Sequence, residues 1–201
     1  MAVSVHTAKS ELRVALKEKL SLLTEAEKAV QSEIVTEKLL KMPQYQQSRR
    51  VSVFLSMKDE IQTHKIMEDL FSSRKDCFIP QYSKAGMKMV RLDSTADYNS
   101  LPETRWKIKQ PALDDVREDA LDTGGLDLIL MPGLGFTKRG LRLGRGKGYY
   151  DNYLRLCRKK GSNPLTIALA YSVQILDDIP MSESDVPVDH VLFADKSEMR
   201  Q

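Results

Sequence analysis

Apolar and polar residues along the chain follow two spacings, one typical of helices and one typical of buried strands. Leucines recur three or four positions apart over residues 8–23, with basic residues between them, which predicts an amphipathic first helix. Thr24 followed by Glu27 is a capping-box pattern that opens a second helix, and this helix ends before Pro43. The chain is therefore predicted to begin with a pair of helices.

The rest of the chain alternates between short apolar runs and further helical stretches. Runs rich in β-branched and aliphatic residues predict strands at 51–55, 77–80, 88–92, 126–131, 165–170 and 190–193. Helices are predicted at 61–71 and 149–160, whereas residues 93–109 show no regular pattern. The run at 126–131 is apolar throughout, which favours a parallel strand covered on both faces. Alternating strands and helices predict a layered α/β domain with the helix pair packed against it.

Length and composition indicate one ordinary globular domain over residues 1–201. Thirty-one basic and 28 acidic residues leave a net charge of only +3, which argues against a polycationic nucleic-acid-binding surface. Cys77 and Cys157 lie far apart without metal-ligand spacing, so we expect reduced thiols and a cytoplasmic protein. The N-terminus lacks the pattern of a signal peptide, and no apolar run is long enough to span a membrane, so no membrane partner is expected.

One segment concentrates glycine and positive charge. Six of the ten glycines lie between Gly133 and Gly148, and no Asp or Glu occurs between Leu128 and Tyr150. Glycine allows backbone N–H groups to turn towards one anion, and basic side chains supply the opposite charge. Five such side chains share the segment, namely Lys138, Arg139, Arg142, Arg145 and Lys147. The pattern predicts a binding loop for an anion such as an oligophosphate.

The residues after Gly148 strengthen this interpretation. A helix starting there directs its positive N-terminal end at the loop, and Asp151 in its first turn is suited to hold the metal ion that accompanies phosphate. The segment is neither a Walker loop, since Gly148 follows Lys147, nor a G-x-G-x-x-G motif. An exposed basic turn is the alternative, but such turns do not need so many glycines. Taken alone, Lys9 and Arg13 indicate a solvated helix face, and the acidic residues Asp114, Asp115, Glu118 and Asp119 indicate a solvated run.

Residues 131–136, Gly140 and residues 142–151 together resemble the signature of the 5-formyltetrahydrofolate cyclo-ligase family. The resemblance extends through residues 9–13 and 54–60, Trp106 with Gln110 and Pro111, residues 123–127, and Asp185 ahead of Val188 and Asp189. In order and spacing it covers nearly the whole chain, and it is nearest to the animal enzymes. It implies a monomeric, cytoplasmic enzyme with a three-layer α/β/α fold around a mostly parallel sheet.

The resemblance also implies a reaction. Family members convert 5-formyltetrahydrofolate to 5,10-methenyltetrahydrofolate and use ATP with Mg²⁺, releasing ADP and phosphate. In the family's mechanism the formyl oxygen attacks the γ-phosphate, and N10 then closes the ring as phosphate leaves. Such chemistry requires the protein to align two substrates and to offset phosphate charge, which suits the glycine-rich basic segment.

Carried over by position, the resemblance assigns residues to each ligand. ATP is expected to contact Lys9, Ser10, Glu11, Leu12, Arg13, Arg142, Leu143, Gly144, Arg145, Gly146, Lys147, Gly148, Tyr149 and Tyr150. Folate is expected to contact Arg13, Leu55, Glu60, Trp106, Arg145, Gly146, Lys147, Gly148 and Tyr149, with Met89 as a further pocket wall. Mg²⁺ is expected at Asp151 and Asp185, and the catalytic set is Arg145, Lys147, Tyr149 and Tyr150. This assignment replaces the solvated interpretation of Lys9 and Arg13.

Two positions depart from the family pattern, and two other functions fit parts of the sequence. Thr137 stands where the family has Asp, and Leu141 stands where it has Asn, so metal affinity is expected to differ. One alternative is an Arg-Gly loop that binds RNA, with Tyr149 and Tyr150 stacked on bases. The other is a different ATP-dependent ligase or kinase on a similar scaffold.

Overall fold

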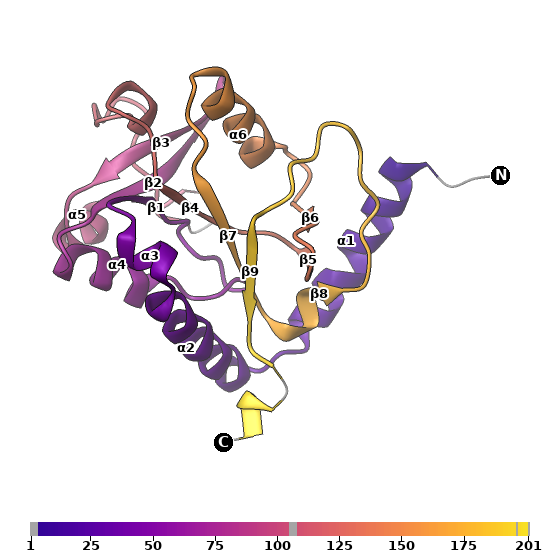
Figure 1. The fold of residues 1–201 in the computed structure, drawn as a ribbon. Helices are drawn as coiled ribbons and strands as arrows, with labels where there is room; N and C mark the ends of the chain where they lie inside the picture. Colours follow the sequence, from indigo (N-terminus) through magenta and orange to yellow (C-terminus); the bar gives the residue numbers. More distant parts are fainter. Residues whose placement is uncertain (1–3, 105–107, 196, 201) are drawn as a thin grey trace.

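A six-stranded sheet forms the centre of the computed structural model, which describes residues 4–104, 108–195 and 197–200 (Figure 1). The strand order is β3-β2-β1-β4-β7-β9, and every neighbouring pair is parallel except the β2–β3 hairpin. The mostly parallel sheet predicted from the sequence is therefore confirmed. The strands are β1 Arg50–Ser52, β2 Asp76–Ser83, β3 Gly86–Leu92, β4 Leu128–Met131, β7 Leu165–Ala170 and β9 His190–Phe193.

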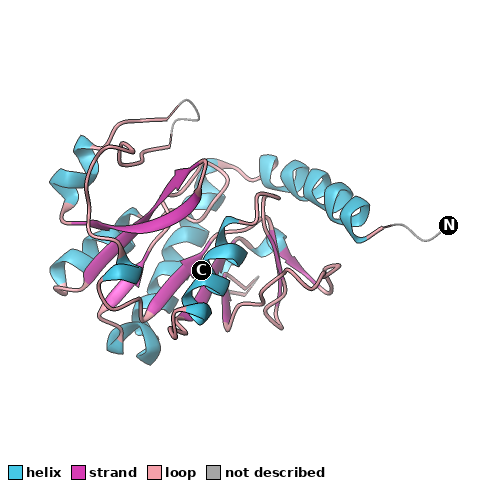
Figure 2. Ribbon diagram, turned by 90° about the horizontal axis from the view of Figure 1, so that it is seen from above, coloured by secondary structure: helices cyan, strands magenta, loops and turns pink. Residues whose placement is uncertain are grey.

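Helices cover both faces of this sheet and produce the three predicted layers (Figures 1 and 2). Along β4, Leu128 and Leu130 point to one face and Ile129 and Met131 to the other, and all four are buried. This alternation explains why the strand is apolar at every position. The first face is covered by α2 Glu25–Lys41, α3 Pro43–Gln47 and α4 His64–Ser72, and the second by α6 Tyr149–Lys159.

A second sheet of three short strands lies beside the main one and was not predicted. Its order is β6-β5-β8, with β5 Gly135–Thr137, β6 Arg142–Leu143 and β8 Ile175–Leu176. The first helix, α1 Val5–Ser21, packs here through Leu16, whose Cδ1 would lie 2.7 Å from a Cβ placed on Gly135. The two N-terminal helices therefore pack on different sheets, α1 on the small one and α2 on the main one (Figure 1).

The α2 helix begins as predicted. Thr24 and Glu27 form both hydrogen bonds of a capping box. In one turn of α2 the apolar side chain faces solvent and the polar one faces the core: Val30 is 49% exposed, whereas Gln31 is buried. Gln31 Oε1 accepts a hydrogen bond of 2.8 Å from the backbone N–H of Ser172, so a polar side chain is satisfied inside the fold.

Several predicted boundaries are corrected by tertiary structure. The first strand ends at Ser52 rather than residue 55, although Val53 remains buried and donates from its backbone to Phe78. The next helix begins at His64, which is exposed, rather than at residue 61. The stretch predicted to be irregular contains a short helix, α5 Thr95–Ser100. The remaining short turns of 3₁₀ helix are Ala120–Asp122, Ser172–Gln174 and Glu198–Arg200.

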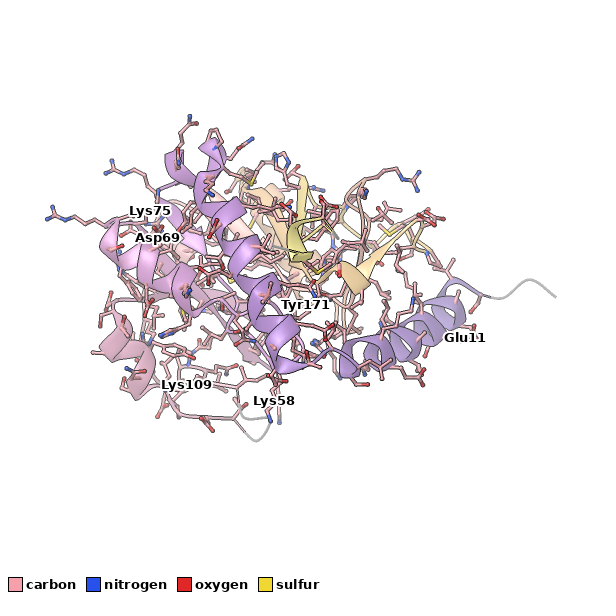
Figure 3. The ribbon with its side chains drawn as sticks, turned by 90° about the horizontal axis from the view of Figure 1, so that it is seen from below. Glu11, Lys58, Asp69, Lys75, Lys109 and Tyr171 are labelled. Atoms are coloured by element: carbon pink, nitrogen blue, oxygen red, sulfur yellow. The ribbon has the colours of Figure 1, made fainter. Side chains whose placement is uncertain are left out.

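The acidic run is the other correction, since only part of it is solvated. Glu118 accepts hydrogen bonds from Arg50 on β1 and Arg91 on β3, the two strands that flank β2, and Asp115 pairs with Arg117 at 2.8 Å. Another charged side chain ties α3 to the start of β2. The ammonium of Lys75, labelled in Figure 3, donates hydrogen bonds to the backbone carbonyls of Tyr45, Gln46 and Ser48. These contacts tie the surrounding chain to β1, β2 and β3.

Both cysteines are buried and unpaired, as predicted. Burial raises the pKa of Cys157 to about 11, so its thiol stays protonated and unreactive at neutral pH. No helix among the described residues combines the length and the apolar character needed to cross a bilayer.

Candidate active site

The basic loop, defined here as residues 142–148, leads from the small sheet into α6. Gly148 has φ +67° and occupies the N-cap position of α6, so a left-handed residue turns the chain into the helix. The positive end of the helix dipole consequently faces the loop. Arg13 of α1 donates from Nε to the Gly144 carbonyl at 2.9 Å, which fastens the first helix to the loop.

The first arginine of the loop, Arg142, is buried and points into the domain. Its Nη2 donates to Asp151 Oδ2 at 2.8 Å, and its Nη1 donates to the Pro132 carbonyl at 3.3 Å. The backbone N–H of Val186 donates to the other carboxylate oxygen of Asp151 at 3.1 Å. Asp151 is thereby fixed at the start of α6 and joined to the segment that carries Asp185.

Asp185 is held in the same manner by a basic residue from far away in the chain. It accepts hydrogen bonds from Lys9, and from the backbone and hydroxyl of Ser182 at 2.6 and 2.8 Å. Burial alone would raise the pKa of Asp185, but the bonds from Lys9 and Ser182 hold it below its ordinary value. Lys9 is only 8% exposed, so interpreting it as part of a solvated face is wrong.

Each of the two predicted metal residues is thus paired with a cation from the predicted nucleotide set. The segments that carry the two carboxylates are joined because the N–H of Val186, which directly follows Asp185, donates to Asp151. Within residues 4–104, 108–195 and 197–200, three or more His, Cys, Asp or Glu side chains nowhere gather in a manner that would hold a metal ion by themselves. Two carboxylates beside a phosphate-type loop match the way Mg²⁺ is bound together with a nucleotide.

The second arginine of the loop, Arg145, reaches across to the segment that follows β1. Its Nη2 donates to Asp59 at 2.8 Å and to Glu60 at 3.1 Å, and its Nε donates to Glu60 at 3.3 Å. The remaining oxygen of the Glu60 carboxylate accepts the Met57 N–H at 2.9 Å. Tyr171, labelled in Figure 3, holds the Glu60 backbone carbonyl through a bond of 2.6 Å. Glu60 is therefore held through both its side chain and its backbone.

Glu60 is a buried carboxylate, at 7% exposure. Burial raises its pKa above the ordinary value, while the guanidinium of Arg145 and the Met57 N–H oppose that rise. A buried carboxylate of this kind needs donors on both oxygens to remain ionised. It is suited to receive a group that offers two N–H donors side by side, as a guanidinium or an amino-heterocycle does.

Aromatic side chains line the path from Glu60 to the start of α6. The rings of Tyr82 and Tyr149 lie 4.9 Å apart with an interplanar angle of 52°. Burial raises the pKa of Tyr82 to about 12, and the charge of Glu60 adds to this effect. Tyr150 is buried, and burial raises its pKa well above 10, so both hydroxyls are protonated at neutral pH. The rings of Tyr82 and Tyr149 therefore provide flat apolar surface near the Glu60 carboxylate.

Comparison with known proteins agrees with this geometry. Residues 5–194 match the profile of the 5-formyltetrahydrofolate cyclo-ligase family. The chain belongs to this family. It is 51% identical to 5-formyltetrahydrofolate cyclo-ligase of Mus musculus over 197 residues, covering 96% of this chain and 97% of the mouse protein. It is 39% identical to a probable 5-formyltetrahydrofolate cyclo-ligase of Caenorhabditis elegans over 194 residues, covering 94% of each chain.

A solved structure shares the fold. The NMR structure of 5,10-methenyltetrahydrofolate synthetase from Aquifex aeolicus superposes with a TM-score of 0.74 at 29% identity, covering 92% of this chain and 88% of that one. The predicted family, its animal type and the α/β fold are confirmed by these matches. The chain is accordingly an enzyme of the cyclo-ligase family.

The structure explains one of the two departures from the family pattern. Thr137 is buried, and its hydroxyl accepts the Leu141 N–H at 3.1 Å across the turn that precedes the basic loop. The Thr137 side chain therefore supports this turn. Leu141 packs against the main apolar core, and no contact accounts for leucine where the resemblance leads us to expect Asn.

The other predicted residues of the cyclo-ligase site fall into three groups. Gly146 has φ +100°, and Lys147 is exposed beside it in the loop. Ser10 and Glu11 are exposed on α1, where Glu11 is labelled in Figure 3. Buried or half-buried positions that pack in the cores are Leu12, Leu55, Met89 and Leu143. Trp106 lies outside the described residues.

Four residues that position the site were missed by sequence reasoning. Asp59 and Tyr171 hold Arg145 and Glu60, and Tyr82 contacts Tyr149. Gln174 donates to the carbonyls of Gly133 and Leu134 and so supports the turn before β5. Only Asp59 left a signal, because two adjacent acidic residues after a strand are natural partners for a basic loop elsewhere in the chain.

Proposed function

We propose that the chain catalyses the ATP- and Mg²⁺-dependent conversion of 5-formyltetrahydrofolate to 5,10-methenyltetrahydrofolate, with release of ADP and phosphate. The observation that carries the proposal is the contact of Arg145 with Glu60. It joins the basic loop, suited to the nucleotide, to a buried carboxylate, suited to the amino-heterocycle of a folate. Arg145 thereby lies between the proposed nucleotide site and the proposed folate site.

The chemistry follows from the poor leaving ability of the formyl oxygen. That oxygen attacks the γ-phosphorus of ATP, and the bond between the γ-phosphorus and its bridging oxygen breaks, releasing ADP. N10 then attacks the formyl carbon and loses its proton, and the C–O bond breaks as phosphate departs. The charge that accumulates on the transferred phosphoryl group requires fixed cations and aligned N–H groups rather than a covalent protein intermediate.

Nucleotide phosphates are assigned to the basic loop and to Lys9 and Arg13 of α1. In the present arrangement Lys9 and Arg142 bond Asp185 and Asp151, and Arg13 bonds the Gly144 carbonyl. Phosphate oxygens would compete for these cations. The remaining contacts from the family pattern, namely Ser10, Glu11, Leu12, Leu143, Gly144, Gly146, Lys147, Gly148, Tyr149 and Tyr150, complete the proposed ATP site.

Mg²⁺ is assigned to Asp151 and Asp185, which supply hard oxygen donors beside the loop. The ion would neutralise phosphate charge and orient the nucleotide. Arg142 and Lys9 hold the two carboxylates in place, so they act as positioning residues for the ion's donors. We therefore expect the nucleotide and Mg²⁺ to bind together. Their binding would release Arg142 and Lys9 from the carboxylates, so that both side chains could contact the phosphates.

The folate is assigned to Glu60, Leu55 and the tyrosines, with Arg13, Trp106, Gly146, Lys147 and Gly148 as further contacts. The 2-amino group and ring N–H of the pterin present two parallel donors, as the guanidinium of Arg145 does towards Asp59 and Glu60. Pterin binding would displace Arg145 towards the transferred phosphoryl group. Arg145 is thus proposed to serve both substrates in turn, with Lys147, Tyr149 and Tyr150 beside the reacting atoms.

The arginine pairings disfavour the RNA-binding alternative. Arg142 and Arg145 both contact carboxylates rather than facing outward as a phosphate-binding strip. The monomeric state and the cytoplasmic location stay predictions from the family resemblance.

Replacing Glu60 by glutamine is expected to raise the KM for folate by about 10–100-fold, because a hydrogen bond to a charged group contributes about 1.5–3 kcal/mol. The KM for ATP should change much less. The raised pKa of Glu60 also predicts that kcat/KM for folate falls on acidification at a higher pH than an exposed glutamate would give, since protonation removes an acceptor. This acidic limb should be absent in Glu60→Gln.

Steady-state kinetics over a pH series checks both statements, with Asp59→Asn as the matched control. That variant also loses a bond from Arg145, yet its carboxylate is less buried than that of Glu60, so its folate KM should rise by less than about threefold. A larger effect of Glu60→Gln on the KM for ATP than on that for folate would place Glu60 in the nucleotide site.

The experiment that tests the proposed function is an omission series. The methenyl product absorbs in the near ultraviolet where the substrate does not, so purified protein is mixed with 5-formyltetrahydrofolate, ATP and Mg²⁺, and each is left out in turn. Absorbance should rise only with all three present. No rise, with ATP binding intact, would favour a different ATP-dependent ligase or kinase.

A further inference from the structure

A hollow of about 330 Å³ lies between the turn of the β2–β3 hairpin and the first turns of α6. Lys84 and Met87 line it from the hairpin side, and Lys147, Tyr149, Asn152 and Leu156 line it from the basic loop and α6. It is separate from the carboxylate contacts of Glu60, Asp151 and Asp185, because none of these three residues lines it.

Two lysines from different elements line this hollow. Lys84 and Lys147 are exposed, and within the described part of the chain neither bonds a carboxylate. No Asp or Glu belongs to the lining, whereas Asn152 contributes an amide and Met87 and Leu156 an apolar floor. An open, basic hollow with an apolar floor fits a small dianion attached to a flat apolar group.

Tyr149 connects this hollow to the rest of the site. Its ring lines the hollow and also contacts Tyr82 at 4.9 Å. Tyr82 in turn lies close enough to Glu60 for the carboxylate charge to affect its hydroxyl. A flat ligand with an amino-heterocycle on Glu60 would run along Tyr82 and Tyr149 and end beside Lys84.

We propose that this hollow binds the dicarboxylate end of the folate substrate, with Lys84 facing a carboxylate of its glutamate group. The inference rests on the proposed function, because it takes 5-formyltetrahydrofolate as the substrate. The substrate has its heterocycle, its aminobenzoyl ring and its two carboxylates in the same order as Glu60, the tyrosine pair and Lys84. The same basic hollow could otherwise take a nucleotide phosphate, and the test separates the two.

The test uses Lys84→Gln, since Lys84 is outside the proposed catalytic and nucleotide-binding sets. The full-length variant is assayed with 5-formyltetrahydrofolate and with its α,γ-dimethyl ester, which lacks both charges. An exposed ion pair contributes about 1 kcal/mol or less, so the KM for the diacid should rise by about threefold to fivefold. The KM for the diester, the KM for ATP and kcat should stay unchanged.

Lys88→Gln is the matched control. Lys88 is exposed on the same hairpin, but its ammonium faces Asp119 at 3.6 Å rather than the hollow. This variant makes the same change of charge and should leave both folate KM values unchanged. Added salt should shrink the difference between diacid and diester in the unaltered protein and in Lys88→Gln, but have little effect on it in Lys84→Gln.

Each contrary outcome is distinguishable. Equal rises for diacid and diester, or no rise for either, would overturn the dicarboxylate site while leaving the proposed function intact. A rise in the KM for ATP would assign the hollow to a nucleotide phosphate. Absence of turnover by the unaltered protein with both folates would overturn the proposed function and, with it, this site.

Discussion

Replacing Asp151 by asparagine is expected to lower kcat/KM for the magnesium nucleotide by more than about 100-fold, since loss of a group that merely supports a metal ligand already costs about 10–100-fold. The change removes a charged oxygen donor at the start of α6 and leaves the buried Arg142 without its carboxylate partner. The concentration of Mg²⁺ needed for half-maximal rate should rise markedly. Rates measured over a Mg²⁺ series at saturating folate check this.

Asp97→Asn is a matched control for the structural part of that effect. Asp97 pairs with Arg117 at 2.7 Å with a similarly low exposure, and it also accepts a backbone N–H, but it lies away from the basic loop. Both variants should lose thermal stability because each removes a carboxylate partner from an arginine with little exposure. Only Asp151→Asn should change the Mg²⁺ requirement. Normal turnover of Asp151→Asn at limiting Mg²⁺ would exclude Asp151 as a ligand.

Replacing Gly140 by alanine is expected to lower the free energy of unfolding by about 2–6 kcal/mol, from backbone strain together with overpacking. Gly140 has φ +91°, and a Cβ there would lie 2.1 Å from the Val188 carbonyl oxygen. The Gly140 carbonyl also accepts the Val188 N–H at 2.8 Å. The contact therefore holds the turn before the basic loop against the segment that follows Asp185. Chemical denaturation measures the loss.

Gly161→Ala separates strain from steric clash. Gly161 has a similar φ of +80°, but a Cβ there would meet nothing within 4 Å. Its substitution should cost only the strain, about 1–3 kcal/mol. Equal losses in the two variants would show that the close approach of Val188 does not constrain Gly140.

Elements with a strong local pattern could be predicted from the sequence. The strands at 165–170 and 190–193 have the predicted bounds, and Thr24 with Glu27 caps α2 as expected. In each case the deciding information lies within a few neighbouring residues: an unbroken apolar run, or a side chain three positions from its backbone partner. Local sequence pattern did not predict the elements whose burial depends on contacts with distant parts of the chain.

The small sheet illustrates the limit. Its strands are two or three residues long and lie within or near a glycine-rich stretch, so no alternation of residue type marks them. They form because β5 pairs with β6 and with the distant β8, and because Leu16 of α1 covers Gly135. Such strands depend on tertiary pairing rather than on propensity.

The candidate site divides in the same manner. The density of glycine and positive charge identified the basic loop, and the family resemblance named Glu60, Asp151 and Asp185. Which charge pairs with which was not predictable, because Lys9 and Asp185 are 176 positions apart and Arg145 and Glu60 are 85 apart. Charge complementarity has no sequence period, so only the fold determines these pairs.

The most direct test of the account follows the formyl oxygen itself. 5-Formyltetrahydrofolate labelled with ¹⁸O in the formyl group is converted in the presence of ATP and Mg²⁺, and the released phosphate is analysed by mass spectrometry. The account predicts one ¹⁸O atom in each inorganic phosphate, because the formyl oxygen attacks the γ-phosphorus and leaves with it. Unlabelled phosphate, with the ¹⁸O recovered in water, would contradict it.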